Sequence, residues 1–547
     1  FHIVIGNPPY GGTKIPEDVQ EALALGSKDP YGAFIARFLG SRQRHSPLAD
    51  GGVLAYIVSD TFMTIKTHRP LREQLLEHRV HKMIRVSGDT FKAVVNCAVI
   101  LCQRGAAAEE HTCQMADLTN VSIHDQYERF LHLLYQTEGF ARRQNVANQT
   151  YAIYHYRQYL IRTNSNLPFF VASPKLFGLM NDTTAHVRHE TVGGKRVPVR
   201  TVQLNGRDIR LVKVGDIAEV KQGLATGDNE NYLFQNPEAH GSYRSIEDYR
   251  KFLLTDEDLS KIRSDETVRV AVVQRGISTT DKKSPRYFGG RYVVPYDKGG
   301  ECDASGGWLP KYHLPTEYFI DWSEAAVAAL RTDTIANVYR RHGKSVPPGK
   351  SKYNTTLASA LRNQEFYFQP GVTFSHTGMY SPTFRTSCGA LFDMAGSTLF
   401  LGGKPIGDVM GLLNSRLWIF LFRNYVNCTV NTSEDPIKEV PLLMESPPRV
   451  RELVSAICRK QREDRLYDYV SNEQLEIDQL VYGTYGLNEA DIREVEDWYA
   501  RRYKTLADAQ RRNLAAKRGM TEDQLITRPT LHLYCDESRQ PAPDFRL

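Results

Sequence analysis

The most constraining feature of this 547-residue chain is an apolar stretch at its start that ends abruptly in two prolines. Residues 2–5 (His-Ile-Val-Ile) have the β-branched, apolar character of a buried strand in a parallel sheet. Pro8 and Pro9 prevent that strand from continuing and fix the backbone after it. Asn7 is therefore expected at the carboxyl end of a strand, where open α/β sheets bind their ligands.

The turn Asn7-Pro8-Pro9-Tyr10 allows two interpretations. In the first, it is a rigid surface turn in which the asparagine caps local backbone and the tyrosine covers apolar surface. In the second, the Asn7 side-chain oxygen and the Pro8 carbonyl accept hydrogen bonds from one planar NH2 group, while Tyr10 offers a face on which a flipped base stacks. The apolar strand before the turn favours the second interpretation.

Three more landmarks follow the turn in order: Tyr-Gly-Ala-Phe at 31–34, Gly-Gly-Val-Leu-Ala-Tyr-Ile-Val at 51–58, and Gly-Asp-Thr-Phe at 88–91 leading into an apolar run at 99–101. With the turn, they resemble the second half of an amino-methylating DNA methyltransferase of the gamma, adenine-N6 class. The resemblance implies S-adenosylmethionine as cofactor and direct methyl transfer to N6 of a flipped adenine. It also implies site roles: Asn7, Pro8, Tyr10 and Phe91 as catalytic residues, and Pro9 and Phe34 approaching the cofactor.

The cofactor half of this enzyme class precedes the turn, as a strand with a glycine-rich bend followed by an acidic residue. No such stretch lies before Phe1. The later glycine pairs, Gly223-x-x-x-Gly227 and Gly402-Gly403, lack the flanking strand and helix of a nucleoside-binding loop. We therefore expect the chain to carry the acceptor half of the site and to need a cofactor-binding segment upstream or on another chain.

Residues 1–105 read as half of a doubly wound sheet, an α/β, partial Rossmann-like methyltransferase lobe. Hydrophobic periodicity predicts helices over 31–44 and 70–77 and strands over 53–58 and 83–86, followed by an apolar run at 93–101. The polar, aromatic segment 106–165 is expected to be a helical connector.

From 166 to 440 the pattern changes to short strands separated by Gly, Pro and Asn, which predicts an α+β domain. The stretches 216–229, 296–301, 390–396 and 413–415 are similar to the target-recognition region of PglX-like proteins of BREX phage-defence systems, of DISARM methylases and of type IIG restriction-modification enzymes. The resemblance implies double-stranded DNA as partner, alongside other defence-system proteins.

Such a domain has to follow phosphates and read base edges. The segment 331–352 holds six basic residues and one acid, so it is a candidate phosphate-contacting loop, although a solvated charged loop is the alternative. The polar residues near 221–229 and 362–385 are equally open to a fold-supporting role. The candidate DNA contacts are Lys221, Gln222, Thr226, Asn229, Arg340, Arg341, Lys350, Arg362 and Arg385.

Composition sets broad limits. A net charge of +6 is compatible with nucleic acid but weak evidence for it. Eight cysteines without a C-x-x-C pair favour reduced thiols, a cytoplasmic protein and no zinc site. No run reaches the length of a membrane span. Residues 441–547 are predicted to be helical, with an apolar stripe that serves packing.

Two further hypotheses remain at this stage. Glu219-Val220-Lys221 has the spacing of a magnesium nuclease, but Asp216 is closer to it than the metal-binding Asp of that pattern, so a nuclease is disfavoured. Asn-Pro-Pro-Tyr also serves methyltransferases that act on RNA or protein. The chain is alternatively a catalytically incomplete DNA-binding or specificity subunit, or a gene remnant, that needs a partner chain.

Overall fold

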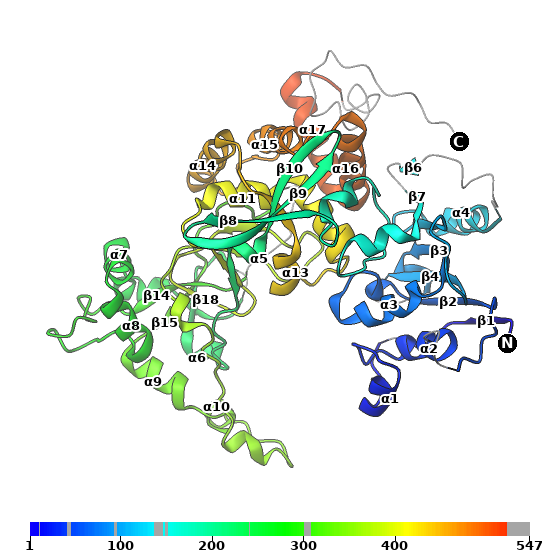
Figure 1. Cartoon of the computed structure of the whole chain (residues 1–547). Helices are drawn as coiled ribbons and strands as arrows, with labels where there is room; N and C mark the ends of the chain where they lie inside the picture. The colour runs from blue at the N-terminus through cyan, green and yellow to red at the C-terminus, as the bar shows by residue number, and fades with distance from the viewer. Residues whose placement is uncertain are drawn as a thin grey trace.

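The computed structural model describes residues 1–9, 11–40, 45–91, 96–135, 146–147, 151–239, 241–299 and 308–521. The chain forms an N-terminal lobe built on one sheet, a region of three smaller sheets, and a helical C-terminal region (Figure 1). The expected combination of a mixed α/β lobe with a helical C-terminal region is what the structure has. No helix in the described part of the chain is long and apolar enough to cross a membrane.

The N-terminal lobe is organised around a seven-stranded sheet of order β1-β2-β4-β3-β5-β7-β6. β1 pairs with β2 in parallel and β3 pairs with β5 in parallel, while the other neighbours are antiparallel. The strands are β1 (Ile3–Gly6), β2 (Val53–Ser59), β3 (Arg79–Val86), β4 (Cys97–Gln103), β5 (Thr112–Asp117), β6 (Val146–Ala147) and β7 (Ala152–Arg157). β1 is therefore an edge strand of this sheet.

The helices of the lobe are α1 (Glu17–Ala22), α2 (Pro30–Leu39), α3 (Arg69–Leu76) and α4 (Ile123–Tyr135). Proline stands in the first turn of both α2 and α3, where its missing N–H costs nothing. α2 ends at Gly40, whose φ of 63° suits glycine. α2 packs on β2, with the ring of Phe38 edge-on to Tyr56 at 6.4 Å. These helices agree with those predicted at 31–44 and 70–77, apart from residues 41–44, which lie outside the described part.

The segment 106–165 is not the helical connector that we expected. β5 and β7 add to the sheet, so the sheet of the lobe continues to Arg157, and the described helical parts of the segment are α4 and the short 3-10 helix η4 (Gln158–Thr163). The reason is tertiary: Tyr154 and Tyr156 alternate with polar residues and are buried in the core, where Tyr156 stacks on Phe170 at 4.4 Å. Aromatic residues at this period favour a strand once a partner strand is available.

One face of the lobe's sheet is only partly covered. Ile3 and Ile5 of β1 are 65% and 79% exposed. The pairing register places Ile5 beside Ala55 of β2, and Ala55 beside Leu101 of β4, both of which are only half-buried. On the opposite face, Val4 packs against the core. The β1 end of this sheet thus presents an apolar edge and an apolar face.

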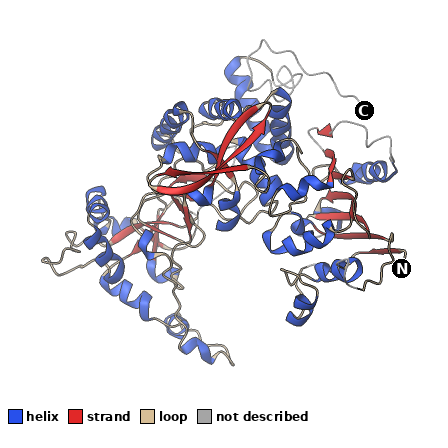
Figure 2. Ribbon diagram, viewed as in Figure 1, coloured by secondary structure: helices blue, strands red, loops and turns tan. Residues whose placement is uncertain are grey.

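Three smaller sheets form the middle region (Figure 2). The first has the order β20-β10-β9-β8, from Pro441–Leu443, Arg207–Lys213, Lys195–Leu204 and His186–Val192. The second has the order β11-β19-β16-β17, from Glu219–Lys221, Thr398–Phe400, Val372–Phe374 and Phe384–Thr386. The third has the order β13-β12-β15-β14-β18, from Arg244–Ser245, Leu233–Gln235, Tyr318–Asp321, Val293–Asp297 and Leu391–Phe392. The expected boundary at 440 is therefore shifted, because β20 belongs to the first of these sheets.

The third sheet has a hydrophobic core of its own, centred on Trp322, Tyr296 and Tyr367. Its helices are α6 (Asn229–Tyr232), α7 (Asp256–Ser264), α8 (Glu266–Arg275), α9 (Glu324–Thr332) and α10 (Ile335–Arg341). The remaining sheets share one continuous core with the N-terminal lobe and the C-terminal helices. α10 and the loop after it project as an arm from this outer subdomain (Figure 1).

The C-terminal region begins earlier than residue 441. α11 (Ile406–Asn414) packs on α14 (Pro448–Glu463), and α12 (Arg416–Leu421) packs on α16 (Glu489–Arg502). A π-helical segment, η10 (Phe422–Val426), continues α12 and is followed by α13 (Glu434–Glu439). The buried Arg416 bonds Glu496, which ties α12 to α16. The last helices are α15 (Glu473–Thr484) and α17 (Lys504–Arg518).

Candidate functional site

β1 delivers Asn7 to the carboxyl edge of the N-terminal sheet. Gly6, its last residue, lies opposite Tyr56 of β2. The Asn7 side chain is exposed and has no hydrogen-bond partner among the described residues, whereas Pro8 is buried. Pro9 is exposed, and Tyr10 lies outside the described part of the chain. The turn thus presents an unpaired amide on an anchored backbone.

The segment that carries Phe91, the fourth expected catalytic residue, lies at the same edge. β4 is antiparallel to both β2 and β3, so β3 runs in the direction of β1 and ends at the same edge. The segment η3 (Gly88–Phe91) follows β3 directly, and the hydroxyl of Thr90 in it donates to Gln126 at 2.6 Å. The Phe91 side chain is outside the described part, but its backbone shares the edge with Asn7, with β2 and β4 between them.

α2 is fixed to this edge by Tyr31. The buried Tyr31 hydroxyl lies 3.1 Å from Thr61 Oγ1 and 3.1 Å from His68 Nε2, and His68 lies 3.2 Å from Asp29. Burial raises the pKa of Tyr31, so the phenol stays neutral and its hydroxyl links α2 to Thr61 and His68 by hydrogen bonds. Phe34, one turn further along α2, is 43% exposed. The structure therefore leaves the predicted cofactor contacts Phe34 and Pro9 accessible.

A buried ionic cluster underlies the edge, and sequence reasoning missed it. Arg85, at the end of β3, lies 2.8 Å from Asp60, which follows β2, and 3.0 Å from Asp117, which ends β5. Burial raises the pKa of Asp60; for Asp117, the charge of Arg85 and bonds from Thr119 outweigh burial and lower the pKa. A charged residue at the last position of several apolar strands was the available signal.

The glycine-rich loop of the middle region has less free polar surface than expected. Lys221 pairs with Glu219 at 3.1 Å and lies over the ring of Phe366. Gln222 donates to Glu434 at 3.0 Å. Thr226 is buried and donates to Asn229 at 2.6 Å. These side chains have local partners, so the fold-supporting role that we left open for them has direct support from geometry.

The basic arm offers more accessible charge. Lys350 is exposed, with no side-chain partner among the described residues, and Arg340 is exposed with a bond to Asn337 at 2.8 Å. Arg341 instead pairs with Asp228 and Asp333, and both carboxylates raise its pKa. Arg341 therefore joins the arm to the subdomain that carries it, while Lys350 faces solvent.

Two arginines of the expected set lie in different environments. Arg362 is exposed. Arg385, on β17, is only 4% exposed and donates to Ser375 at 3.2 Å. A buried guanidinium cannot reach a phosphate, so the expectation for Arg385 is corrected: its role is inside the second sheet. The strand pattern around Arg385 did not reveal which face it occupies.

The residues with nuclease-like spacing line a hollow of about 390 Å³ between the first and second sheets. Lys221 and Lys195 both bond Glu219 and lower its pKa, whereas burial raises the pKa of Asp216. Among the described residues, no group of three or more His, Cys, Asp or Glu side chains could hold a metal ion. The charged side chains of Glu219, Lys195 and Lys221, which line the hollow, are thus paired with one another.

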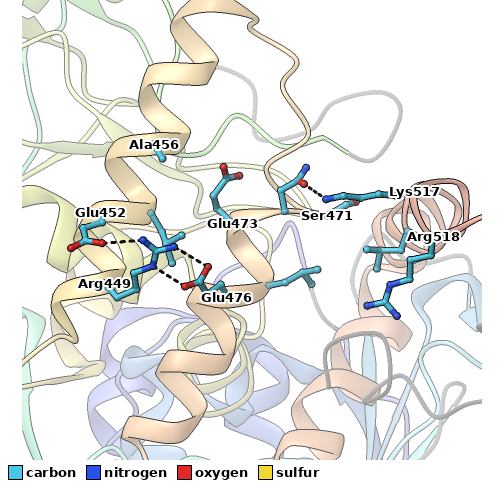
Figure 3. A pocket seen from close by; sticks show the side chains of 12 residues that line it. Arg449, Glu452, Ala456, Ser471, Glu473, Glu476, Lys517 and Arg518 are labelled. Carbon is cyan, nitrogen blue, oxygen red and sulfur yellow. Dashed lines mark hydrogen bonds and ion pairs between the residues drawn. The ribbon is translucent and has the colours of Figure 1, made fainter. Parts of the chain in front are cut away.

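A second hollow of about 650 Å³ lies in the C-terminal region between α14, α15 and α17 (Figure 3). Arg449 points toward Glu476 and Glu452, at 2.8 Å and 3.0 Å. Lys517 bonds Asn472 across the hollow. Arg449, Glu452 and Glu476 are thus paired with one another, and the hollow lies on helices remote in sequence from the Asn7 turn.

Comparison with known proteins gives a result for the first part of the chain. Residues 1–91 match the family model of the Eco57I restriction-modification methylase. No curated relative matches the sequence. This region contains the Asn7 turn, α2, α3 and η3, so the site described above falls within the match.

Similar solved structures include two restriction-modification enzymes. The type IIL enzyme MmeI in complex with DNA is 12% identical with a TM-score of 0.45, and the match covers 92% of this chain and 57% of that one. The type IIG restriction endonuclease BpuSI is 11% identical with a TM-score of 0.31, with 93% and 54% covered. The chain spans a little over half the length of these two proteins. Its first 91 residues match a restriction-modification methylase domain.

Proposed function

We propose that this chain carries the base-binding and target-recognition portions of an S-adenosylmethionine-dependent DNA adenine-N6 methyltransferase. The observation that carries the proposal is the exposed amide of Asn7, which has no hydrogen-bond partner among the described residues and stands beside the buried Pro8 at the carboxyl edge of the sheet, within the segment that matches a methylase family. The earlier similarity to PglX-like, DISARM and type IIG proteins favours a restriction-modification or phage-defence system as its setting.

The proposed chemistry follows from the low nucleophilicity of the adenine amino group. This group is delocalised into the ring and is a poor nucleophile. If the Asn7 side-chain oxygen and the Pro8 carbonyl accept hydrogen bonds from its two N–H groups, the nitrogen becomes pyramidal and its lone pair points out of the plane of the ring. This is catalysis by positioning and electrostatics. Tyr10 and Phe91 supply aromatic faces that hold the flipped base.

The residues of this chain fit the acceptor side of the cofactor site. S-adenosylmethionine, when bound, supplies the methyl group. Phe34 and Pro9 are exposed and would contact it. Asn7 and Pro8 hold the adenine amine, and Arg85 holds the strand ends that place them.

The uncovered part of the sheet supports a role for a cofactor-binding segment or partner chain. Among the described strands, β1 pairs with β2 alone, and its Ile3 and Ile5 are exposed on an apolar face. Long apolar edges of this kind are normally paired or covered. We propose that the cofactor-binding half adds a strand at β1 and covers Ile3 and Ile5, whether it is joined to the chain upstream or carried by another protein.

The DNA contacts that geometry supports best are on the outer subdomain. Arg340, Lys350 and Arg362 are exposed, and the arm that carries Lys350 projects from the molecule (Figure 1). Lys and Arg on such an arm would bind phosphates and orient the duplex without reading its sequence. We assign an indirect role in DNA binding, through stabilising the shape of the glycine-rich loop and the arm, to Lys221, Gln222, Thr226, Asn229 and Arg341.

The test uses the full-length protein purified from its native locus. Methyl transfer from S-adenosylmethionine is measured to duplex DNA, RNA and protein, and N6-methyladenine is mapped in the genome with and without the gene. Asn7→Ala is expected to lower transfer to DNA by about 10²-fold or more. DNA affinity should stay within about twofold, because phosphate contacts dominate it.

A matched control is Asn513→Ala, which changes an exposed asparagine on α17 and should leave transfer unchanged. Full turnover by the Asn7→Ala variant would contradict the proposed site. Transfer to RNA or protein instead of DNA would select the alternative acceptor. DNA binding without cofactor binding or transfer would identify a specificity subunit that relies on a partner.

A further inference from the structure

A loop of the middle region and a loop of the C-terminal region meet beside the N-terminal lobe. The first comprises residues 376–380, after β16, and the second comprises residues 427–432, after the π-helical segment η10. They pair through their backbones: the Gly378 N–H donates to the Val430 carbonyl at 3.2 Å, and Thr432 N–H donates to the His376 carbonyl at 2.6 Å. We call them the paired loops.

The paired loops are anchored at the carboxyl edge of the N-terminal sheet. Thr64 Oγ1 lies 3.3 Å from Cys428 Sγ and accepts a bond from the Cys428 backbone N–H at 3.2 Å. Thr64 belongs to the segment that leaves β2 through Asp60, and β2 is the strand paired with β1. On the other side, Arg502 donates to the Cys428 carbonyl. The paired loops therefore lie at the carboxyl edge of the sheet in which β2 pairs with β1, the strand that precedes Asn7.

The second loop is held in one shape by its own hydrogen bonds. The side-chain oxygen of Asn427 accepts from the backbone and hydroxyl of Thr429 at 2.9 and 2.8 Å, and its NH2 group donates to the Asn431 carbonyl at 2.7 Å. The buried Arg423 donates to the Thr429 carbonyl. A loop fixed so fully loses little further conformational entropy when it binds a ligand.

This rigid framework presents apolar side chains to solvent. Val430, between the residues that pin the loop, is 48% exposed, and Met379 on the partner loop is 54% exposed. Single exposed apolar residues are common on protein surfaces. Here the two loops that carry them pair through their backbones, and Tyr380 of the first loop packs against the core while Met379 beside it stays exposed.

Duplex DNA offers an apolar gap of matching chemistry. When a base is flipped out of the helix, its stacking partners are exposed, and proteins that distort DNA insert apolar side chains between base steps. A β-branched valine has one strongly preferred rotamer, which suits insertion, and methionine adapts its shape beside it. Asn431, next to Val430, is exposed and has a side-chain amide to bond the surrounding nucleotides.

We infer that the paired loops form a wedge that enters the duplex beside the target base, with Val430 in the gap left by the flipped adenine and Met379 supporting it. The inference rests on the proposed function. It assigns to residues 376–380 and 427–432 a positioning role: the wedge lowers the free energy of the extruded base and touches neither the adenine nor the cofactor.

The test measures base flipping directly in the full-length protein. A duplex with the methylated sequence carries 2-aminopurine at the target position, whose fluorescence rises on unstacking. In the Val430→Ala/Met379→Ala double variant, the fluorescence rise is expected to fall about fivefold, because the extruded state loses apolar contact. The control is Leu466→Ala, which shortens a side chain that is 64% exposed in the C-terminal region and should change nothing.

A rescue substrate separates a wedge from a purely structural role. If the base opposite the target is removed, flipping no longer breaks a base pair, and the double variant should recover to within about twofold of wild type. Unchanged flipping by the double variant, or a loss that this substrate does not rescue, would overturn the wedge. If wild type itself never raises the fluorescence of any duplex, the proposed function fails, and the wedge with it.

Discussion

The Nη2 atom of Arg85 lies 2.8 Å from Oδ2 of Asp60, although these residues come from the ends of two strands that are separated by β4. Both side chains are more than nine-tenths buried. A second carboxylate, Asp117, contacts the same guanidinium. The pairing fixes the carboxyl ends of three strands relative to one another, at the edge where Asn7 and η3 are displayed.

Removing Arg85 should therefore destabilise the N-terminal lobe strongly. Arg85→Met leaves two buried carboxylates without a counter-charge, and we expect a loss of about 3–5 kcal/mol, measured by hydrogen exchange of the β2, β3 and β5 amides. The lost stability should return in part as the pH is lowered. A buried carboxyl with a raised pKa stabilises the fold when protonated, and this contribution disappears as the pH rises through that pKa.

A surface ion pair between the same lobe and α13 is the control for Arg85. Lys66 lies 3.7 Å from Glu439, and its side chain is 70% exposed. Lys66→Met should cost less than about 1 kcal/mol because solvent screens the pair. Equal effects of the two substitutions would contradict the structural role of the Arg85 cluster.

Glu434 should make the junction between the second sheet and α13 sensitive to acid. His376 lies 3.1 Å from its carboxylate and Ser397 also bonds it; these bonds outweigh burial and lower the pKa of Glu434 to about 2. A depressed pKa gives stability that is complete above the ordinary value and is lost as the pH falls through about 2.

Glu434→Gln is therefore expected to be less stable than wild type at neutral pH, with a gap that closes as the pH falls from about 4.5 toward about 2. Urea midpoints at several pH values measure it. Glu445→Gln, at a carboxylate that is 83% exposed, is the control and should show no such pH-dependent gap. A gap that stays constant down to pH 3 would refute the assignment.

The sequence was most informative where a local rule and the tertiary structure agree. The helices begun by Pro30 and near Pro70 and the β2 strand follow from proline position and apolar alternation. The pattern also placed Asn7 at a strand end. It failed for Tyr154 and Tyr156, whose strand depends on pairing with β5, a contact that no local pattern specifies. It also could not show that Arg385 points inward.

Side-chain partners explain why candidate site residues that look alike in the sequence differ in the structure. Arg340 and Arg341 are exposed neighbours in one basic stretch, yet Arg340 bonds the nearby Asn337 whereas Arg341 is held by Asp228 and Asp333. Asp228 is more than 100 residues away in the sequence, so composition alone makes the two arginines equivalent. Only the fold separates a phosphate contact from a structural ion pair.

The arm gives a prediction that distinguishes these roles. Lys350→Ala removes one exposed charge and should weaken DNA binding while lowering the slope of log affinity against log salt by about 0.9. Arg341→Ala should instead loosen the arm, seen as faster hydrogen exchange in α10, because Asp228 and Asp333 lose their partner. Lys504→Ala on α17, 80% exposed, is the control and should leave the slope unchanged. An unchanged slope in the Lys350 variant would remove the arm from the DNA interface.

The open β1 edge yields the last prediction. Ile3 and Ile5 are the large apolar side chains that are exposed on the described strands of the lobe, and an uncovered apolar edge promotes edge-to-edge association. When residues 1–547 are produced by themselves, they should associate as concentration rises, and Ile3→Lys/Ile5→Lys should keep them monomeric in sedimentation velocity. Val187→Lys, on the edge strand β8, provides the control because its side chain is 43% exposed but its sheet lies in the middle region. Association that persists in the double variant, or that Val187→Lys abolishes equally, would place the adhesive surface elsewhere and remove the main support for a covering segment at β1.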